Sequence, residues 1–159
     1  SIHDNVADKI VGSLPFQITS PLLHQIINYP WWKIASLLIQ KEVAEKLTAK
    51  PPRANYLSNF VQSFADVKLI TTVERESFFP VPGVDGAIVR LEPKIDFRKE
   101  ILDPVKWSHF LHRGFSHPRQ MINKAFPGEI LIKSGVDPGH RPATLTGEEW
   151  LKLYILCLP

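Results

Sequence analysis

The chain has 159 residues, of which 44% are hydrophobic and 22% are charged, and its formal net charge is +3. This composition excludes a disordered or fibrous protein and is typical of one or two small globular domains. No run of about 18 uncharged apolar residues is present, and the first residues lack the features of a signal peptide, so we expect no membrane segment. The single cysteine, Cys157, forms no internal disulfide, and we expect a cytoplasmic protein.

The first part of the chain alternates predicted strands with predicted helices, as α/β proteins do. A strand over Lys9–Gly12 precedes a helix that begins at about Ser20, which can cap it, with Pro21 at the first helical position. The nearly continuous apolar run Ile34–Ile39 is typical of a strand covered on both faces, as in a parallel sheet. Further helices are predicted at about Lys41–Lys50 and Tyr56–Ala65, and an antiparallel pair of strands at Val67–Val73 and Gly86–Leu91.

The second part of the chain is predicted to be helical. Alternation typical of strands ends near Glu92, so we place a domain boundary within 94–103 and divide the chain into domains 1–95 and 96–159. Thr146 and Glu149 form the pattern of a capping box, and the helix after them is apolar nearly all round, which predicts burial on more than one side. The predicted helices are Pro104–Gly114, Pro118–Ala125, Glu129–Ser134 and Thr146–Leu158.

The segment Ser13-Leu14-Pro15-Phe16 follows the first predicted strand, and ligands of open α/β sheets bind at the carboxyl ends of strands. Proline fixes the backbone there, and phenylalanine offers a face on which a flat base can stack. From these residues alone, a plain strand-to-helix turn remains the alternative. The segment resembles the N-L-P-[FY] motif of the adenine-N6 methyltransferases that act on ribosomal RNA, with Ser13 where that family carries asparagine.

This resemblance implies roles for all four residues of the segment. The side chain at Ser13 and the backbone carbonyl of Leu14 would accept hydrogen bonds from the exocyclic amine of the target adenine, beside the methyl donor. Pro15 would fix those acceptors, and Phe16 would stack on the ring. Acceptors placed around a conjugated amine favour the developing charge of methyl transfer, which is why such a reaction needs them.

A second segment, 78–87, resembles the F-F-P-x-P-x-V-D-S-A loop of the small-subunit rRNA dimethyladenosine transferases. The resemblance implies that Phe78, with Phe79 as the alternative, forms the other wall of the adenine pocket; on their own, both would be interpreted as core anchors of a loop. Phe115–Lys124 resembles that family's F-[ST]-x-x-R-K-x-[LI]-x-N helix. Other blocks that resemble it, in the same order, are 18–23, 40–50, 57–62, 135–138 and 141–146.

Positive charge is concentrated in residues 94–125, which carry seven Lys and Arg against three Asp and Glu. We interpret this segment as a surface that contacts RNA phosphates; a solvated helical face is the alternative. His109 and His112 lack acidic or cysteine partners at ligand spacing, so we expect no metal site. The candidate RNA-binding residues are Arg98, Lys99, Arg113, His117, Arg119 and Lys124.

The glycine-rich turn that holds S-adenosylmethionine in Rossmann-type methyltransferases is not found, because no two glycines form G-x-G. The resemblance therefore implies an α/β fold: the C-terminal part of a Rossmann-like class I methyltransferase domain, followed by a small all-helical domain. It implies an rRNA adenine N6,N6-dimethyltransferase that uses S-adenosylmethionine, of which this chain is a piece that is inactive alone. The expected partner is small-subunit rRNA or the pre-ribosomal small subunit, bound by a monomer.

Two alternatives to this function remain open. One is the related group of large-subunit rRNA methyltransferases that confers antibiotic resistance, against which the long helical C-terminal region argues. The other is a non-catalytic RNA-binding or ribosome-assembly module, for which serine at position 13 would be no handicap.

Overall fold

The computed structural model describes residues 8–15, 18–29, 32–94 and 97–158. Within these residues, four strands form one sheet in the order β1-β2-β4-β3. Strand β1 (Lys9–Ser13) pairs in parallel with β2 (Ile34–Gln40), and β4 (Gly86–Pro93) lies antiparallel to both β2 and β3 (Ala65–Val73). The predicted strands and the antiparallel pairing of the last two are confirmed. The sheet is mixed rather than parallel, because β4 returns between β2 and β3.

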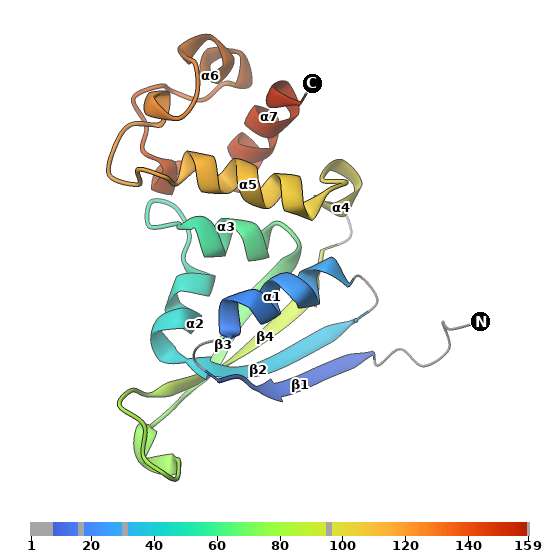
Figure 1. The fold of residues 1–159 in the computed structure, drawn as a ribbon, viewed down its shortest axis with the longest axis vertical. Helices are drawn as coiled ribbons and strands as arrows, with labels where there is room; N and C mark the ends of the chain where they lie inside the picture. The colour runs from blue at the N-terminus through green and yellow to red at the C-terminus, as the bar shows by residue number, and fades with distance from the viewer. Residues whose placement is uncertain (1–7, 16–17, 30–31, 95–96, 159) are drawn as a thin grey trace, which may run out of the picture.

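Helices α1 (Thr19–Asn28), α2 (Lys41–Thr48) and α3 (Tyr56–Gln62) lie on one face of this sheet (Figure 1). The expectation that β2 is covered on both faces is wrong for the described part of the chain. Its buried side chains, Ala35, Leu37 and Ile39, alternate with half-buried ones, because no described helix lies on the opposite face.

Ser20 does not cap α1, contrary to expectation. The helix begins at Thr19, no side chain caps it at Ile18, and Pro21 is its third residue. The Thr19 hydroxyl donates to the carbonyl of Pro15 at 3.4 Å. The side chain of the first helical residue therefore stabilises the turn that precedes the helix.

The C-terminal region is helical, with one exception to the predicted elements. It contains α4 (Phe97–Glu100), α5 (Pro104–Gly114), α6 (Gly128–Ser134) and α7 (Gly147–Cys157), and the capping box of Thr146 with Glu149 is confirmed. The predicted helix Pro118–Ala125 is wrong: only a 3-10 turn forms, at Ile122–Lys124. The backbone N–H of Ile122 donates to His140 instead, and the Ile122 side chain is buried in the core.

Helix α7 was expected to be buried on more than one side, and this is only partly so. Trp150, Leu153 and Tyr154 are buried, whereas Ile155 and Leu156 remain 45% and 46% exposed. Helix α5 packs against α7 through edge-on aromatic rings, including Trp107 against Tyr154. The described helices therefore cover one side of α7 and leave the other open.

Helix α5 also packs against α3, and a stack of rings joins it to the sheet region. The Tyr56 ring lies 3.7 Å from that of His112, and the His24 ring lies 4.1 Å from that of Phe60, measured between centroids. The Tyr56 hydroxyl is 2.8 Å from Ser108 Oγ and 3.2 Å from His24 Nε2. Buried residues from both parts of the chain form one cluster. The division into domains 1–95 and 96–159 remains a proposal.

We expect this stack to make the free energy of unfolding depend on pH. Burial, and secondarily the neighbouring His112, lower the pKa of His24 below its ordinary value, so the unfolded chain binds a proton more readily than the folded one. Stability should therefore fall as pH drops through about 6.5, the ordinary histidine pKa. We expect His24→Gln to flatten this dependence in urea unfolding compared between about pH 7.5 and about pH 5.5. His109→Gln, at an exposed position of α5, is the control; an unchanged slope in His24→Gln would contradict the prediction.

Candidate functional site

A pocket of about 300 Å³ joins the two segments that the sequence singled out. Ser13, Leu14 and Pro15 form one side of it at the carboxyl end of β1, and the loop between β3 and β4 forms the other. This volume is at the lower end of the range for small-molecule sites, roughly 300–1,000 Å³. The loop contributes Phe78, Phe79, Pro80 and Pro82, and the sheet contributes Leu38, Ile39 and Gly86.

Strand pairing fixes the position of the segment Ser13-Leu14-Pro15 at the edge of the sheet. Ser13 lies opposite Leu38 in the parallel ladder, and the N–H of Leu14 donates to the Leu38 carbonyl at 2.9 Å. The side chain of Leu14 is buried, whereas Ser13 is exposed at the mouth of the pocket. Phe16, expected to stack on the base, lies outside the described residues. The carbonyl of Pro15 already accepts hydrogen bonds from the N–H of Ile18 and the hydroxyl of Thr19.

The two phenylalanines of the loop differ in their surroundings. Phe78 is half-buried and rests on Gly86: a Cβ at position 86 would lie 3.1 Å from Phe78 Cζ and 3.2 Å from Leu38 Cδ1. Phe79 is fully exposed. An aromatic side chain that packing already holds in place loses less conformational entropy when a base stacks on it. This favours Phe78 as the second wall of the pocket.

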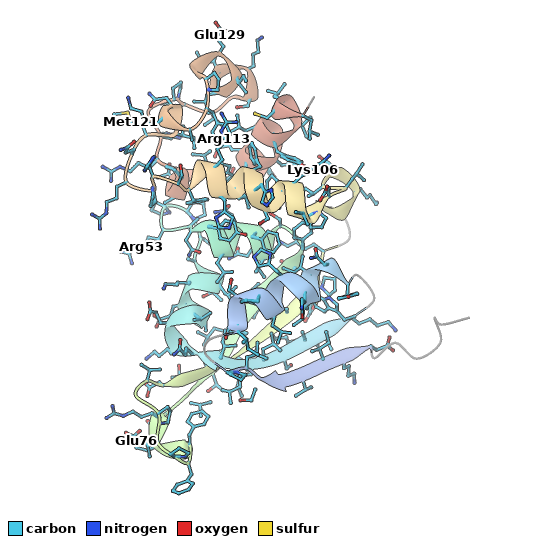
Figure 2. All side chains as sticks on the ribbon, in the orientation of Figure 1. Arg53, Glu76, Lys106, Arg113, Met121 and Glu129 are labelled. Carbon is cyan, nitrogen blue, oxygen red and sulfur yellow. The ribbon has the colours of Figure 1, made fainter. Side chains whose placement is uncertain are left out.

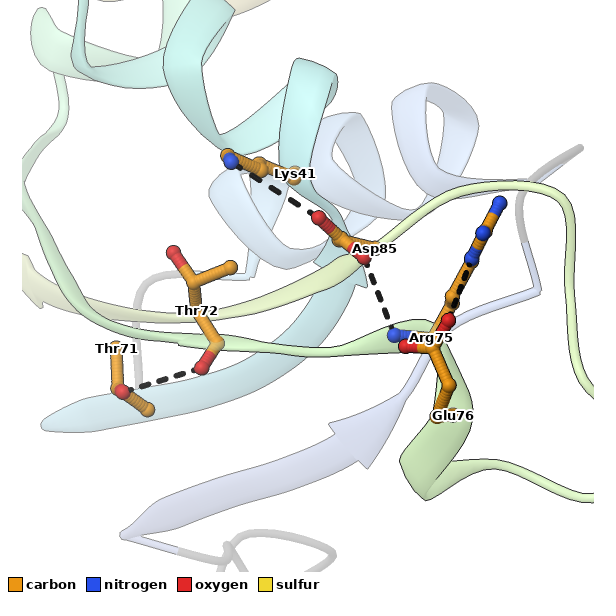
Figure 3. Close-up of polar contacts among 6 residues, drawn as sticks. All are labelled: Lys41, Thr71, Thr72, Arg75, Glu76 and Asp85. Atoms are coloured by element: carbon orange, nitrogen blue, oxygen red, sulfur yellow. Dashed lines mark hydrogen bonds and ion pairs between the residues drawn. The ribbon is translucent and has the colours of Figure 1, made fainter.

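The loop is held at its base by Asp85, as Figure 3 shows. Its carboxylate accepts from the N–H of Arg75 at 3.1 Å and lies 3.9 Å from Lys41 Nζ, and its carbonyl accepts from the N–H of Lys41 at the start of α2. Arg75 also pairs with Glu76. Sequence reasoning did not single out Asp85, although it stands in the loop motif directly before β4.

We expect Asp85→Ala to weaken binding of an adenine nucleoside severalfold, because the loop that carries Phe78 loses the hydrogen bond between the Arg75 N–H and the Asp85 carboxylate. Nucleoside titration followed by NMR measures the affinity. Amide hydrogen exchange of residues 75–85 measures how far the loop has loosened. Glu76→Ala is the matched control, because Glu76 is exposed and pairs on the surface with Arg75. Equal nucleoside affinities for Asp85→Ala and Glu76→Ala would contradict this prediction.

A larger hollow, of about 690 Å³, lies beside the loop and is mainly acidic. Two basic residues, Lys41 and Arg75, face five acidic ones there, so this surface repels RNA phosphates. The acidic residues are Glu42, Glu45, Glu74, Glu76 and Asp85. The apolar pocket is therefore the better candidate for a base.

The candidate RNA-binding residues lie in the helical region, at the other end of the long axis from the loop 74–85 (Figures 1 and 2). Lys99, His117, Arg119 and Lys124 are exposed. Arg113 is exposed too, but its Nε donates to the carbonyl of Ala125 at 2.9 Å and its guanidinium covers the Phe126 ring. The side chain of Arg98 lies outside what the structure describes. A ligand that reached both surfaces would have to be much longer than one nucleotide.

No ligand set of three His, Cys, Asp or Glu residues that could hold a metal ion occurs among the described residues. None of the described helices is long and apolar enough to cross a membrane. Sequence reasoning missed Leu38 and Ile39 as pocket residues; the signal was available, because carboxyl ends of neighbouring parallel strands meet at one edge.

Comparison with known proteins gives one family. The profile described as Ribosomal RNA adenine dimethylase matches residues 1–157. Ribosomal RNA small subunit methyltransferase A of Sulfurihydrogenibium sp. is 34% identical over 156 residues, which cover 96% of this chain and 60% of that protein. The protein of the same name from Thermotoga maritima is 37% identical, with 91% of this chain and 50% of that protein covered.

Solved structures agree with this relationship. A dimethyladenosine transferase from Plasmodium falciparum superposes with a TM-score of 0.84 and 26% identity, over 96% of this chain and 68% of that one. The 23S rRNA methyltransferase ErmE gives a TM-score of 0.69, also at 26% identity, over 93% of this chain and 64% of that one. The described fold is thus the Rossmann-like α/β fold of these methyltransferases, continued by helices. The chain spans 50% to 60% of the length of the two curated relatives, and it belongs to the ribosomal RNA adenine dimethylase family.

Proposed function

We propose that this chain is the target-adenine half of an S-adenosylmethionine-dependent rRNA adenine N6,N6-dimethyltransferase. The observation that carries the proposal is the pocket in which Ser13, Leu14 and Pro15 face Phe78 across the edge of the sheet. Phe16 and Phe78 would hold a flipped adenine between them, and stacking on an aromatic side chain contributes about 1–3 kcal/mol per base. The Ser13 hydroxyl and the Leu14 carbonyl would accept from its amine.

The partner we propose is small-subunit rRNA within the assembling small subunit. Lys99, His117, Arg119 and Lys124 would contact its phosphates, with Arg98 beside them, while Arg113 would fix the turn that presents them. The separation of this surface from the pocket suits a folded RNA. We propose a monomer, since one copy of the chain supplies both faces of the pocket. We also propose that the protein is cytoplasmic.

The methyl donor would bind outside these residues, near Ser13. Within the described residues, no strand pairs with the outer edge of β1 and no helix covers the second face of the sheet, and further strands and helices of such a fold would lie there. We therefore expect the 159-residue chain alone to show no micromolar binding of S-adenosylmethionine in calorimetric titration, and no methyl transfer. Clear micromolar binding would contradict this expectation, because it would place a complete donor site within these residues.

A second candidate function is a non-catalytic module that binds rRNA during assembly. Serine at position 13 favours it, because a hydroxyl is shorter than the amide of asparagine and polarises the amine less. RNA binding that persists in a reconstituted protein without methylation would support this candidate. The two curated relatives are both named small subunit methyltransferases, which supports a small-subunit rather than a large-subunit substrate.

A further inference from the structure

The loop between β3 and β4 carries exposed apolar side chains at its tip. It projects beyond the end of the sheet, as Figure 1 shows. The side chain of Phe79 is fully exposed, and Val81 and Val84 are 58% and 46% exposed. Single apolar side chains are common on protein surfaces, but several of them on one projecting loop indicate a surface that contacts another molecule.

The backbone of this loop turns Phe78 and Phe79 to different sides. Phe78 has an extended backbone, with φ −109° and ψ 150°, and successive side chains of an extended chain point to opposite sides. Phe78 accordingly rests on Gly86 in the wall of the pocket, while the side chain of Phe79 lies in solvent at its mouth. The N–H of Phe78 donates to the Arg75 carbonyl at 3.1 Å, and Pro80 restricts the backbone of Phe79. A stiff loop therefore holds the exposed ring outward.

The charge beside the loop determines which part of an RNA the loop can contact. Glu74 and Glu76 line the acidic hollow of about 690 Å³. Arg75, which stands between them in the chain, is already paired with Glu76. Because this surface repels phosphates, the loop is suited to contact the bases of an RNA rather than its backbone. The exposed ring of Phe79 offers the flat apolar face that such a contact needs.

Extrusion of an adenine leaves a gap in the base stack of the RNA, and the loss of stacking opposes the extrusion. Proteins that open a base stack often insert an apolar side chain between the bases, and phenylalanine is one of those used. When the extruded base lies against Phe78, the gap that it has left lies outside the mouth of the pocket. The ring of Phe79 projects on that side.

We propose that Phe79 inserts into the RNA base stack at the place that the target adenine has left. The proposal rests on the proposed function and deepens it: Phe78 binds the extruded base, and Phe79 stabilises the opened stack. Phe79 is then a positioning residue that makes no contact with the reacting amine. An adenine that is unstacked from the start gains nothing from Phe79, and this difference can be measured.

The test compares the affinity of the 159-residue chain for two labelled RNAs, measured by fluorescence anisotropy. One is a hairpin with a bulged adenine stacked within its stem, and the other is an oligouridine strand with one adenine, in which stacking is weak. We expect Phe79→Ala to weaken binding of the hairpin about tenfold and binding of the oligouridine strand less than about twofold. Phe79→Leu should retain most of the affinity for the hairpin, because leucine also inserts between bases. Val81→Ala, at an exposed apolar position of the same loop, is the matched control and should leave both affinities unchanged.

The results that would overturn the proposal differ in what they mean for the proposed function. Equal losses of affinity for the two RNAs in Phe79→Ala would make Phe79 a wall of the pocket, so the insertion would be wrong while the adenine pocket stands. Unchanged binding of the hairpin by Phe79→Ala, or an equal loss in Val81→Ala, would also overturn the insertion alone. Phe78→Ala should weaken binding of both RNAs. If Phe78→Ala, shown to be folded by circular dichroism, changes neither affinity, the assignment of the pocket fails and the insertion of Phe79 fails with it.

Discussion

Replacing Gly114 with alanine should lower the free energy of unfolding by about 1–3 kcal/mol, the usual cost of adding atoms to a packed core. A Cβ at this position would lie 2.3 Å from Trp150 Cη2 and 2.6 Å from Trp150 Cζ3. Trp150 is fully buried and is enclosed by Phe110, Phe115 and Phe126, so its ring has nowhere to move. The better helix propensity of alanine offsets little of this cost, because Gly114 is the last residue of α5.

Urea unfolding of Gly114→Ala measures the loss, and Gly128→Ala is the control. A Cβ at Gly128 meets nothing within 4 Å, so that variant should be close to wild type. Adding Trp150→Phe to Gly114→Ala should restore part of the stability, since the smaller ring vacates the clashing positions. The indole N–H of Trp150 has no hydrogen-bond partner among the described residues, so phenylalanine loses no described bond there. Wild-type stability of Gly114→Ala alone would show that α5 and α7 are packed differently.

Phe78→Ala should weaken binding of an adenine nucleoside by about 5- to 150-fold, which corresponds to the loss of about 1–3 kcal/mol of stacking on one ring. The ring is held over Gly86 and lines the pocket opposite Ser13, so the free protein already presents it to a base. Stability should change less, because Phe78 is only half-buried. Nucleoside titration and urea unfolding of the same variant separate the two effects.

Phe79→Ala is the comparison for this prediction. Phe79 lines the same pocket, but its side chain is fully exposed and lacks the support that Phe78 has from Gly86. We expect a smaller loss of affinity than for Phe78→Ala. A larger loss of affinity for Phe79→Ala would show that Phe79, and not Phe78, forms the second wall of the pocket. No loss of affinity in either variant would show that the loop is not part of the binding site.

Local sequence rules predicted most of the elements, because each has a strong local signal. The capping box of Thr146 with Glu149 is one example, and the apolar run that became β2 is another. The predicted helix Pro118–Ala125 failed for a tertiary reason: Ile122 is drawn into the core and its N–H bonds to His140, far along the chain. No local pattern contains that partner.

The candidate site was predictable in its parts and not in its assembly. Periodicity places Ser13 at the end of a strand, but only the family resemblance brought Phe78 opposite it. The ladder that sets Leu38 beside Ser13 and the close approach of Phe78 to Gly86 follow from strand register and packing between distant segments. Asp85 escaped notice because its role as an anchor depends on Lys41 and Arg75 lying beside it in the fold.

The central claim is that these residues form the target-base half of an rRNA adenine dimethyltransferase. The most direct test joins to this chain the part of the Thermotoga maritima relative that the match leaves uncovered. The fusion would carry Ser13→Asn, and methyl transfer from labelled S-adenosylmethionine to small-subunit RNA would be measured. We predict labelled N6-methylated adenine in the RNA, and its loss when Phe78→Ala is added. A fusion that binds S-adenosylmethionine and the RNA yet methylates no adenine would contradict the claim.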